Sequence, residues 1–109
     1  MGYHDYQNSW TPILGEELVC VIQPDNEYDK YSVAVIKNNQ DVGHLMKGAS
    51  GKFAKNIFYF LRAEDTNSCK ASVKGKPVNL GKGMGLQIPC ILEFTGKPQM
   101  IAMLKSRIL

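Results

Sequence analysis

The feature that most restricts the fold of this chain is a run of alternating side chains in its C-terminal part. Every second residue there is apolar: Leu86, Ile88, Cys90, Leu92 and Phe94. A period of two places these side chains on one face of a β-strand, which we expect over residues 86–95. Pro89 falls on the opposite face and lacks an N–H donor, so this strand should lie at a sheet edge or contain a bulge.

Four earlier segments predict further strands, at residues 17–22, 31–37, 42–45 and 69–74. The first is a continuous apolar run, typical of a strand that is buried on both faces. The second and third are separated by Asn38, Asn39 and Gln40, which favour a tight turn and hence a hairpin. The fourth alternates again, with Lys70 and Lys74 on its solvent face.

Two helices are expected beside these strands. Apolar residues recur at helical spacing at Phe53, Ile57, Phe60 and Leu61. They line one face of a helix over residues 50–62, with Ser50 as its N-cap. Pro98 and the apolar residues that follow it predict a short C-terminal helix over residues 98–108.

The order of these elements favours an all-β fold with accessory helices. Five or six strands, with a helix between the third and fourth, match a small OB-like barrel, which is a partly open Greek key. An SH3-like or other small barrel has the same order of elements, so the sequence does not decide between these topologies. A chain of 109 residues holds one hydrophobic core. We therefore expect a single domain over residues 1–109, with its core at about residues 10–96.

Composition excludes several classes of protein. The apolar runs fall well short of the ~20 residues that cross a bilayer, so no membrane span is expected. No signal-peptide pattern opens the chain, which favours an intracellular protein. Three widely spaced cysteines, Cys20, Cys69 and Cys90, fit neither a disulfide framework nor a zinc site. Buried free thiols and no bound metal are therefore expected.

Catalysis is not indicated by any motif in the chain. A nucleophile needs a base within reach and an orienting group, and the two histidines, His4 and His44, stand in no such motif. A pair of Cys20 with His44 is the one arrangement left open. Residues 81–85 are rich in glycine but lack the Ser or Thr of a phosphate-binding loop, so we interpret them as a flexible connection. We expect no catalytic residues and no cofactor.

The net charge of +3 hides an uneven distribution along the chain. Residues 1–54 contain four Lys or Arg and seven Asp or Glu, whereas residues 55–109 contain nine and three. The two halves therefore carry −3 and +6. A basic patch for an anionic partner and ordinary solvated lysines both account for this asymmetry.

Two polar segments are candidates for a binding site. The long loop after the first strand contains Asn26, Tyr28 and Asp29, and the third strand carries His44 near its end and is followed closely by Lys47. Tyrosine offers a stacking face, aspartate accepts from a hydroxyl, and histidine and lysine donate to phosphate, which together suit the end of a nucleic-acid strand. The alternative is scaffolding, in which Tyr28 packs on the barrel, Asp29 closes an Asx turn and Lys47 is solvated.

These segments resemble the HIRAN domain family. The resemblance is carried by Pro-Asp-Asn-Glu-Tyr-Asp-Lys at residues 24–30, Val-Ala-Val at 33–35, Val-Gly-His-Leu at 42–45 and Gly-Leu-Gln-Ile-Pro-Cys at 85–90. It spans about residues 10–96 and marks the chain as similar to a divergent member. Members of this family have an OB-like fold and occur alone or attached to helicases and nucleases. The best-understood member grips the 3′ end of single-stranded DNA.

The resemblance implies a site for a DNA 3′ end made by Trp10, Asn26, Tyr28, Asp29, Lys30, His44, Lys47 and Leu86. Asp29 would accept a hydrogen bond from the terminal hydroxyl, and Tyr28 would contact the terminal nucleotide. His44 and Lys47 would hold phosphates, and Trp10 would be the stacking platform. Two departures weaken the implied site: an arginine of DNA-binding relatives is missing from the N-terminal segment, and Leu86 replaces an aromatic residue.

The sequence therefore predicts a noncatalytic module that captures single-stranded DNA, with a preference for a free 3′-hydroxyl. The resemblance also implies a nuclear location, a role in DNA repair, and a helicase or nuclease domain in cis or a protein partner. The C-terminal helix is expected to pack on its own sheet rather than on a second copy, which favours a monomer. The alternative function is a protein-interaction module that presents Trp10, Tyr28 and Phe58 to a peptide or partner domain.

Overall fold

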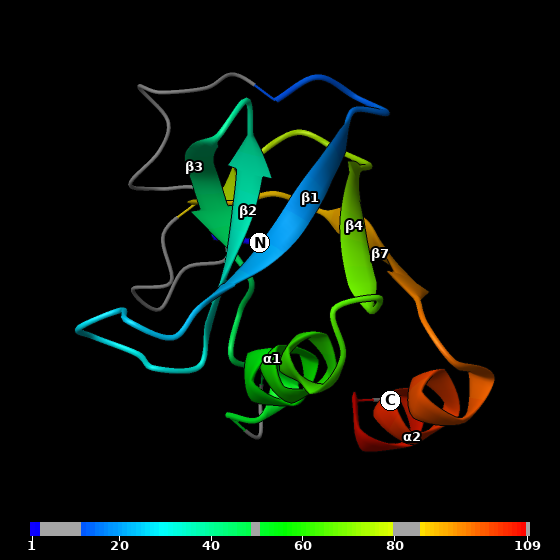
Figure 1. Cartoon of the computed structure of the whole chain (residues 1–109). Coiled ribbons are helices and arrows are strands. Elements are labelled where there is room, and N and C mark those ends of the chain that lie inside the picture. The colour runs from blue at the N-terminus through cyan, green and yellow to red at the C-terminus, as the bar shows by residue number, and fades with distance from the viewer. Residues whose placement is uncertain (3–11, 49–50, 80–85, 109) are drawn as a thin grey trace.

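A five-stranded antiparallel sheet with strand order β3-β2-β1-β4-β7 organises the molecule (Figure 1). The computed structural model describes residues 1–2, 12–48, 51–79 and 86–108. The five strands are β1 (Glu17–Gln23), β2 (Ser32–Lys37), β3 (Gln40–His44), β4 (Ser68–Val73) and β7 (Cys90–Thr95). A second, two-stranded sheet pairs β5 (Val78–Asn79) with β6 (Leu86–Gln87), and the helices are α1 (Phe53–Ala63) and α2 (Pro98–Ile108).

The fold class expected from the sequence is confirmed. The structure is mostly β, α1 lies between β3 and β4, and α2 is the short C-terminal helix. The described part of the large sheet is open, with β3 and β7 as its edges, rather than closed into a barrel. The backbone of Gly2 partly bridges the opening, because it pairs with His44 of β3 on one side and with Gln87 of β6 on the other.

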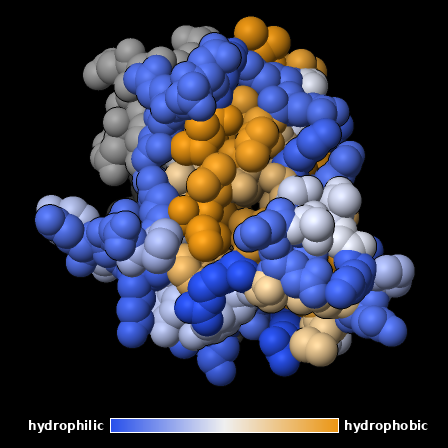
Figure 2. Space-filling model, viewed as in Figure 1, coloured by the Kyte–Doolittle hydropathy of each residue, from blue (hydrophilic) through white to orange (hydrophobic). Residues whose placement is uncertain are grey.

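The apolar run in β1 is buried on one face only, so the expectation of burial on both faces is wrong. Leu18 and Cys20 are buried, whereas Val19 and Val21 are 52% and 45% exposed. The core and α1 pack against one side of the sheet, and the described residues place no layer on the other. Figure 2 shows the resulting apolar surface over the middle of the molecule.

The strand expected over residues 86–95 is interrupted in its middle. β6 and β7 are separated by Ile88 and Pro89, where the backbone leaves both ladders. The Ile88 N–H donates to the Met1 carbonyl at 2.9 Å, and Lys74 N–H donates to the Pro89 carbonyl at 2.9 Å. Pro89 has no donor of its own, and β7 is an edge strand, as the position of this proline indicated.

The hairpin of β2 and β3 turns where the sequence predicts. Asn38 and Asn39 have φ values of 52° and 64°, the left-handed conformation that a two-residue turn requires. Further along, Lys52 occupies the N-cap of α1 without a side-chain capping bond, so the N-cap predicted at Ser50 is wrong. Ser50 itself lies outside the described residues.

The two helices lie together at one end of the sheet (Figure 1). α1 buries Ala54, Ile57, Phe58 and Phe60 in the core. α2 packs mainly on α1 through the buried Leu104, rather than on the sheet as expected. Within the described residues, neither helix is long and apolar enough to span a bilayer.

The three cysteines are free thiols, as predicted. Cys20 of β1 and Cys69 of β4 are buried and share a hydrogen bond, which lowers the pKa of Cys20 and raises the pKa of Cys69. Cys90 is half-buried, and this burial raises the pKa of its thiol. All three thiols therefore belong to the packing of the core side of the sheet.

Gly43 lies where the backbone of Gly2 crosses β3. A Cβ at this position would stand 2.6 Å from the Gly2 carbonyl oxygen and 3.0 Å from Cε of Met1. We expect Gly43→Ala to lower the free energy of unfolding by about 1–3 kcal/mol, because the added methyl group overpacks a closed site. Urea denaturation measures this change. Gly2→Ala is the control, since its methyl would meet nothing nearer than 3.7 Å, and equal stabilities of the two variants would contradict the prediction.

Candidate functional site

A groove of about 510 Å³ opens between the loop after β1 and the end of β3. We call it the β1–β3 groove; it is lined by Gln23, Asn26, Tyr28, Asp29, Ser32, Asp41, His44, Leu45 and Lys47. Five of the residues predicted from the sequence are in this set: Asn26, Tyr28, Asp29, His44 and Lys47. The structure thus brings together two segments that the sequence analysis singled out separately.

The loop after β1 takes its shape from the side chain of Asn26. Its Oδ1 accepts hydrogen bonds from the N–H groups of Tyr28 at 2.9 Å and Asp29 at 3.0 Å. Its own N–H donates to the Gln23 carbonyl at 3.1 Å. Asparagine suits this position because its short amide mimics a backbone turn. Asn26 therefore positions its neighbours in the groove.

Asp29 closes an Asx turn and also faces the β1–β3 groove. Its Oδ1 accepts from the N–H of Tyr31 at 2.9 Å, and its carbonyl accepts from the N–H of Ser32 at 3.1 Å. Its other carboxylate oxygen has no partner among the described residues. Asp29 can therefore close the turn with one carboxylate oxygen while the other oxygen accepts a hydrogen bond from a ligand.

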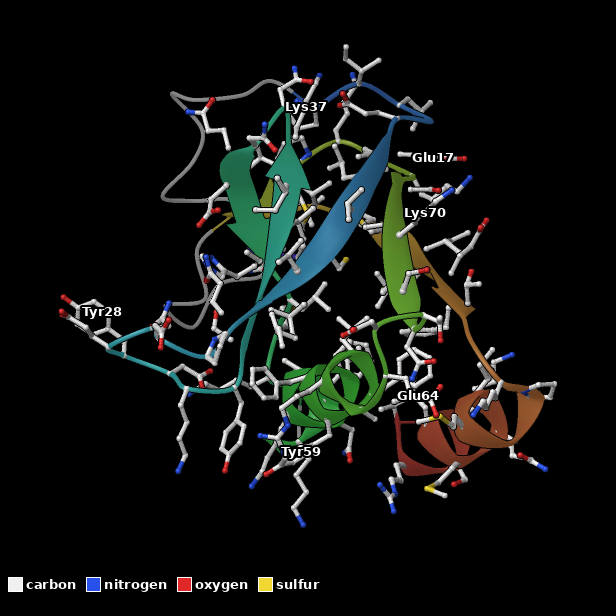
Figure 3. All side chains as sticks on the ribbon, viewed as in Figure 1. Glu17, Tyr28, Lys37, Tyr59, Glu64 and Lys70 are labelled. Atoms are coloured by element: carbon white, nitrogen blue, oxygen red, sulfur yellow. The ribbon has the colours of Figure 1, made fainter. Side chains whose placement is uncertain are left out.

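Tyr28 does not pack on the sheet. Its side chain is 94% exposed and projects from the tip of the loop (Figure 3). The scaffolding interpretation of this residue is therefore wrong. An exposed aromatic ring at the rim of a polar groove offers a face on which a base or another flat group stacks.

A polar network centred on Gln23 forms one wall of the β1–β3 groove. The Gln23 Nε2 donates to Asp41 Oδ2 at 2.8 Å, and its Oε1 accepts from Ser32 Oγ at 3.2 Å. The same Oε1 lies 2.8 Å from His44 Nε2. Because a carboxylate only accepts, the amide nitrogen must face Asp41, and His44 must then donate from Nε2.

Four residues of the groove were not predicted as site residues: Gln23, Ser32, Asp41 and Leu45. The register of β1 against β2 places Gln23 opposite Ser32, and β3 supplies Asp41 and His44, which pair with Ile36 and Ala34 on the two sides of a register shift. Polar residues at the ends of predicted strands were the available signal. These polar residues indicate a shared site only when the register of the strands across the eight-residue loop between β1 and β2 is known.

The described part of the structure does not place the other three predicted site residues in the β1–β3 groove. Lys30 is not among the residues that line the β1–β3 groove, and its Nζ lies 5.2 Å from the centre of the Tyr31 ring. Trp10 lies outside the described residues. Leu86 belongs to β6, and its side chain lies outside the described part of the structure.

The charge of the β1–β3 groove is mixed. Asp29 and Asp41 contribute carboxylates, whereas Lys47 contributes an ammonium group and His44 an imidazole. Across the described ranges, no group of three His, Cys, Asp or Glu side chains could hold a metal ion. Hydroxyl acceptance at a carboxylate and phosphate contact at a lysine are the interactions that this lining supports.

The fold and the groove define a small β-rich module with a polar groove at one end of its sheet. No family model and no curated protein sequence matches the chain. The crystal structure of the HIRAN domain of human HLTF is similar, with a TM-score of 0.68 and 21% identity over 98% of this chain and 79% of that chain. The NMR structure of the HLTF HIRAN domain gives a TM-score of 0.68 and 19% identity, over 97% and 80%. The chain therefore has the HIRAN-domain fold, which confirms at the level of structure the likeness seen in the motifs.

The Gln23 amide should fix the tautomer of His44. In the wild-type protein, neutral His44 is expected to carry its proton on Nε2, because Gln23 Oε1 accepts it. Gln23→Leu removes this acceptor and should lower the population of the Nε2–H tautomer. Long-range ¹H–¹⁵N NMR spectra distinguish the two tautomers. Ser32→Ala is the control because it leaves the acceptor in place, and an unchanged tautomer in Gln23→Leu would contradict the assignment.

Proposed function

We propose that this domain is a noncatalytic nucleic-acid-binding module that captures the 3′ end of single-stranded DNA in the β1–β3 groove. The observation that carries the proposal is that Tyr28, Asp29 and Lys47 line one groove. The HIRAN-domain fold is consistent with this role. Such end capture is useful to a nuclear protein that works with a helicase or nuclease in DNA repair.

Each part of a 3′ end has a counterpart in this lining. The terminal hydroxyl donates to the second oxygen of Asp29, and the preceding phosphate accepts from Lys47. The terminal base stacks on Tyr28, and Trp10 supplies a further aromatic face. A 3′-phosphate would instead bring its negative charge against the carboxylates of Asp29 and Asp41. The groove therefore favours a hydroxyl end.

His44 takes part mainly as a wall of the groove. Its Nε2–H is donated to Gln23, so Lys47 is the principal phosphate donor of this lining. Asn26 acts through the loop that it shapes. Lys30 lies outside the groove and contacts DNA only if the strand continues past Tyr31.

A second candidate function is protein binding through the same sheet and loop surface. Phe58 takes no part in it, because this side chain is 2% exposed and belongs to the core. The exposed Tyr28, together with Val19, Val21 and Ile91 on the open sheet face, favours this candidate. Salt distinguishes the two functions, because phosphate contacts weaken steeply with ionic strength and an apolar interface does not.

Asp29→Asn tests recognition of the hydroxyl end without breaking the loop. The asparagine Oδ1 still closes the turn with Tyr31, but the negative charge is lost. We expect affinity for a 3′-hydroxyl oligonucleotide to fall about tenfold, as a charge-assisted bond becomes a neutral one, while affinity for the 3′-phosphate form rises. Fluorescence anisotropy with both oligonucleotides measures the preference. Asp25→Asn, in the same loop but outside the groove, is the control, and an unchanged preference in Asp29→Asn would refute the role.

Lys47→Ala tests the phosphate contact separately. Loss of one contact should weaken binding of both oligonucleotide forms alike and reduce the slope of log affinity against log salt by about 0.7 for a single strand. Anisotropy titrations at several salt concentrations give this slope. Lys74→Ala, an exposed lysine outside the groove, should leave the slope unchanged; if both variants behave alike, Lys47 has no specific role.

A further inference from the structure

A second basic surface runs along α1, outside the β1–β3 groove. Lys55, Tyr59 and Arg62 are spaced four and three residues apart, so they form one stripe on the helix. This stripe lies on the side away from the core residues Ala54 and Ile57. Neither the net charge nor the motifs of the sequence assign it a role.

Aromatic rings hold the cations of this surface. Lys30 and Lys55 place their Nζ atoms 5.2 and 4.6 Å from the centre of the Tyr31 ring, and the Arg62 guanidinium lies 4.8 Å from that of Tyr59. The two tyrosine rings are themselves 5.4 Å apart. We call these five residues the tyrosine–cation cluster.

The tyrosine–cation cluster has no acidic partner within the described residues. The ion pairs there use Lys37, Lys70 and Lys97, and no carboxylate lies within ion-pair distance of Lys30, Lys55 or Arg62. Contacts of cations with exposed rings stabilise by only about 0.5–1 kcal/mol and do not neutralise charge. Three cations gathered in this way repel one another, and a polyanion would relieve the repulsion.

The hydroxyl groups of the cluster are also polarised by their neighbours. A hydrogen bond from Tyr59, with the nearby charges of Lys30 and Lys55, lowers the pKa of Tyr31. The donating Tyr59 has a raised pKa for the same reason. The two rings thus lie side by side, with an interplanar angle of 54°, and carry the cations over their faces.

The cluster is continuous with the β1–β3 groove. A hollow of about 190 Å³ is lined by Asp29, Tyr31, Lys47, Gly51, Ala54 and Lys55. It shares Asp29 and Lys47 with the groove and reaches the cluster at Tyr31 and Lys55. A chain that leaves the groove at Lys47 therefore meets these cations next.

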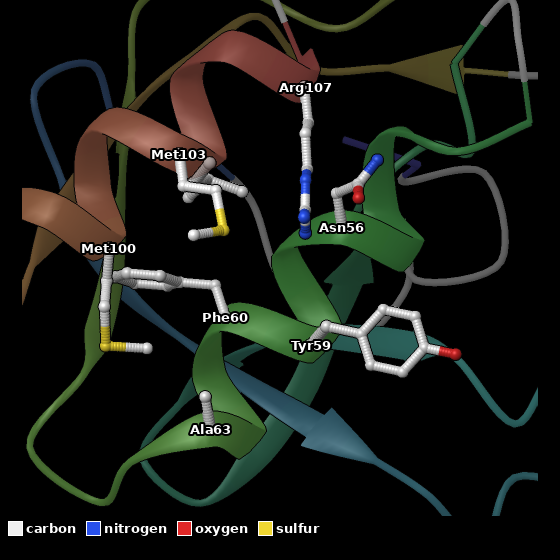
Figure 4. A pocket seen from close by; sticks show the side chains of 8 residues that line it. Asn56, Tyr59, Phe60, Ala63, Met100, Met103 and Arg107 are labelled. Atoms are coloured by element: carbon white, nitrogen blue, oxygen red, sulfur yellow. The ribbon is translucent and has the colours of Figure 1, made fainter.

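An apolar pocket borders the cluster at Tyr59. This pocket, of about 230 Å³, lies between α1 and α2 and is lined largely by apolar side chains, with Tyr59 among its lining residues. In Figure 4 the Tyr59 ring points away from Phe60 and Met100, which also line the pocket. Tyr59 therefore belongs both to the pocket lining and to the cluster, where the Arg62 guanidinium lies over its ring.

We propose that the tyrosine–cation cluster binds the phosphodiester backbone of the nucleotides that precede the 3′ end. This inference rests on the proposed function of the β1–β3 groove. The ligand is phosphate rather than base, because the cations already occupy the ring faces and a guanidinium and two ammonium groups suit phosphate oxygens. The strand leaves the groove past Lys47, crosses Tyr31 and follows α1 to Arg62.

The test compares two oligonucleotides that share one 3′-hydroxyl end, a dinucleotide and a strand of about ten nucleotides. The double variant Lys55→Ala/Arg62→Ala removes two cations and spares Tyr31, which packs edge-on against Phe58. The control, Lys74→Ala/Lys105→Ala, makes the same change of net charge at exposed lysines outside the cluster. Isothermal titration calorimetry gives the affinities without a label, and thermal melting by circular dichroism verifies that both variants are folded.

We expect the wild-type protein to bind the longer strand more tightly than the dinucleotide. Lys55→Ala/Arg62→Ala should weaken the longer strand about tenfold, lower its salt slope by about 1.4, and leave the dinucleotide within about twofold. The inference is overturned if the dinucleotide binds but length adds nothing, or if the variant weakens both ligands equally. If the wild-type protein binds neither strand, the proposed function fails together with it.

Discussion

The side-chain amide of Gln23 joins the three strands on which the β1–β3 groove depends. From the end of β1 it bonds to Ser32 of β2 and to Asp41 and His44 of β3. A hydrogen bond of this kind contributes about 1 kcal/mol, yet the set permits only one orientation of the amide. The loop between β1 and β2 leaves the sheet directly after this junction. The hydrogen bonds of Gln23 therefore fix the point at which this loop leaves the sheet beside the groove.

Local patterns predicted most of the fold, and the failures have a common cause. Three correctly predicted features depend on residues that are close in sequence. They are the turn at Asn38 and Asn39, the edge position of the strand after Pro89, and both helices. Burial of β1 on both faces was a wrong prediction because an apolar run does not reveal how many layers cover a sheet. α2 packs on α1 rather than on the sheet for a similar reason, since its partner is set by tertiary contacts.

The candidate site likewise combines residues that local sequence patterns indicated with residues that only the structure brings together. Asn26, Tyr28 and Asp29 lie within one loop, and their residue types alone indicated a turn that carries exposed functional groups. Gln23 meets His44 across 21 residues of sequence, and Tyr31 meets Tyr59 across a similar distance along the chain. No spacing rule connects such residues. Their meeting depends on strand register and on the packing of α1 against β2, which only the structure supplies.

The bracing of the loop after β1 has a kinetic consequence. Asn26 and Asp29 hold the loop through their own side chains, so Tyr28 is presented on a framework that already has its final shape. A preorganised loop loses little conformational entropy when a ligand arrives. Encounter then needs no folding step, and association is governed by diffusion and charge. Discrimination between one strand terminus and another would accordingly appear in the residence time of the complex rather than in the speed with which it forms.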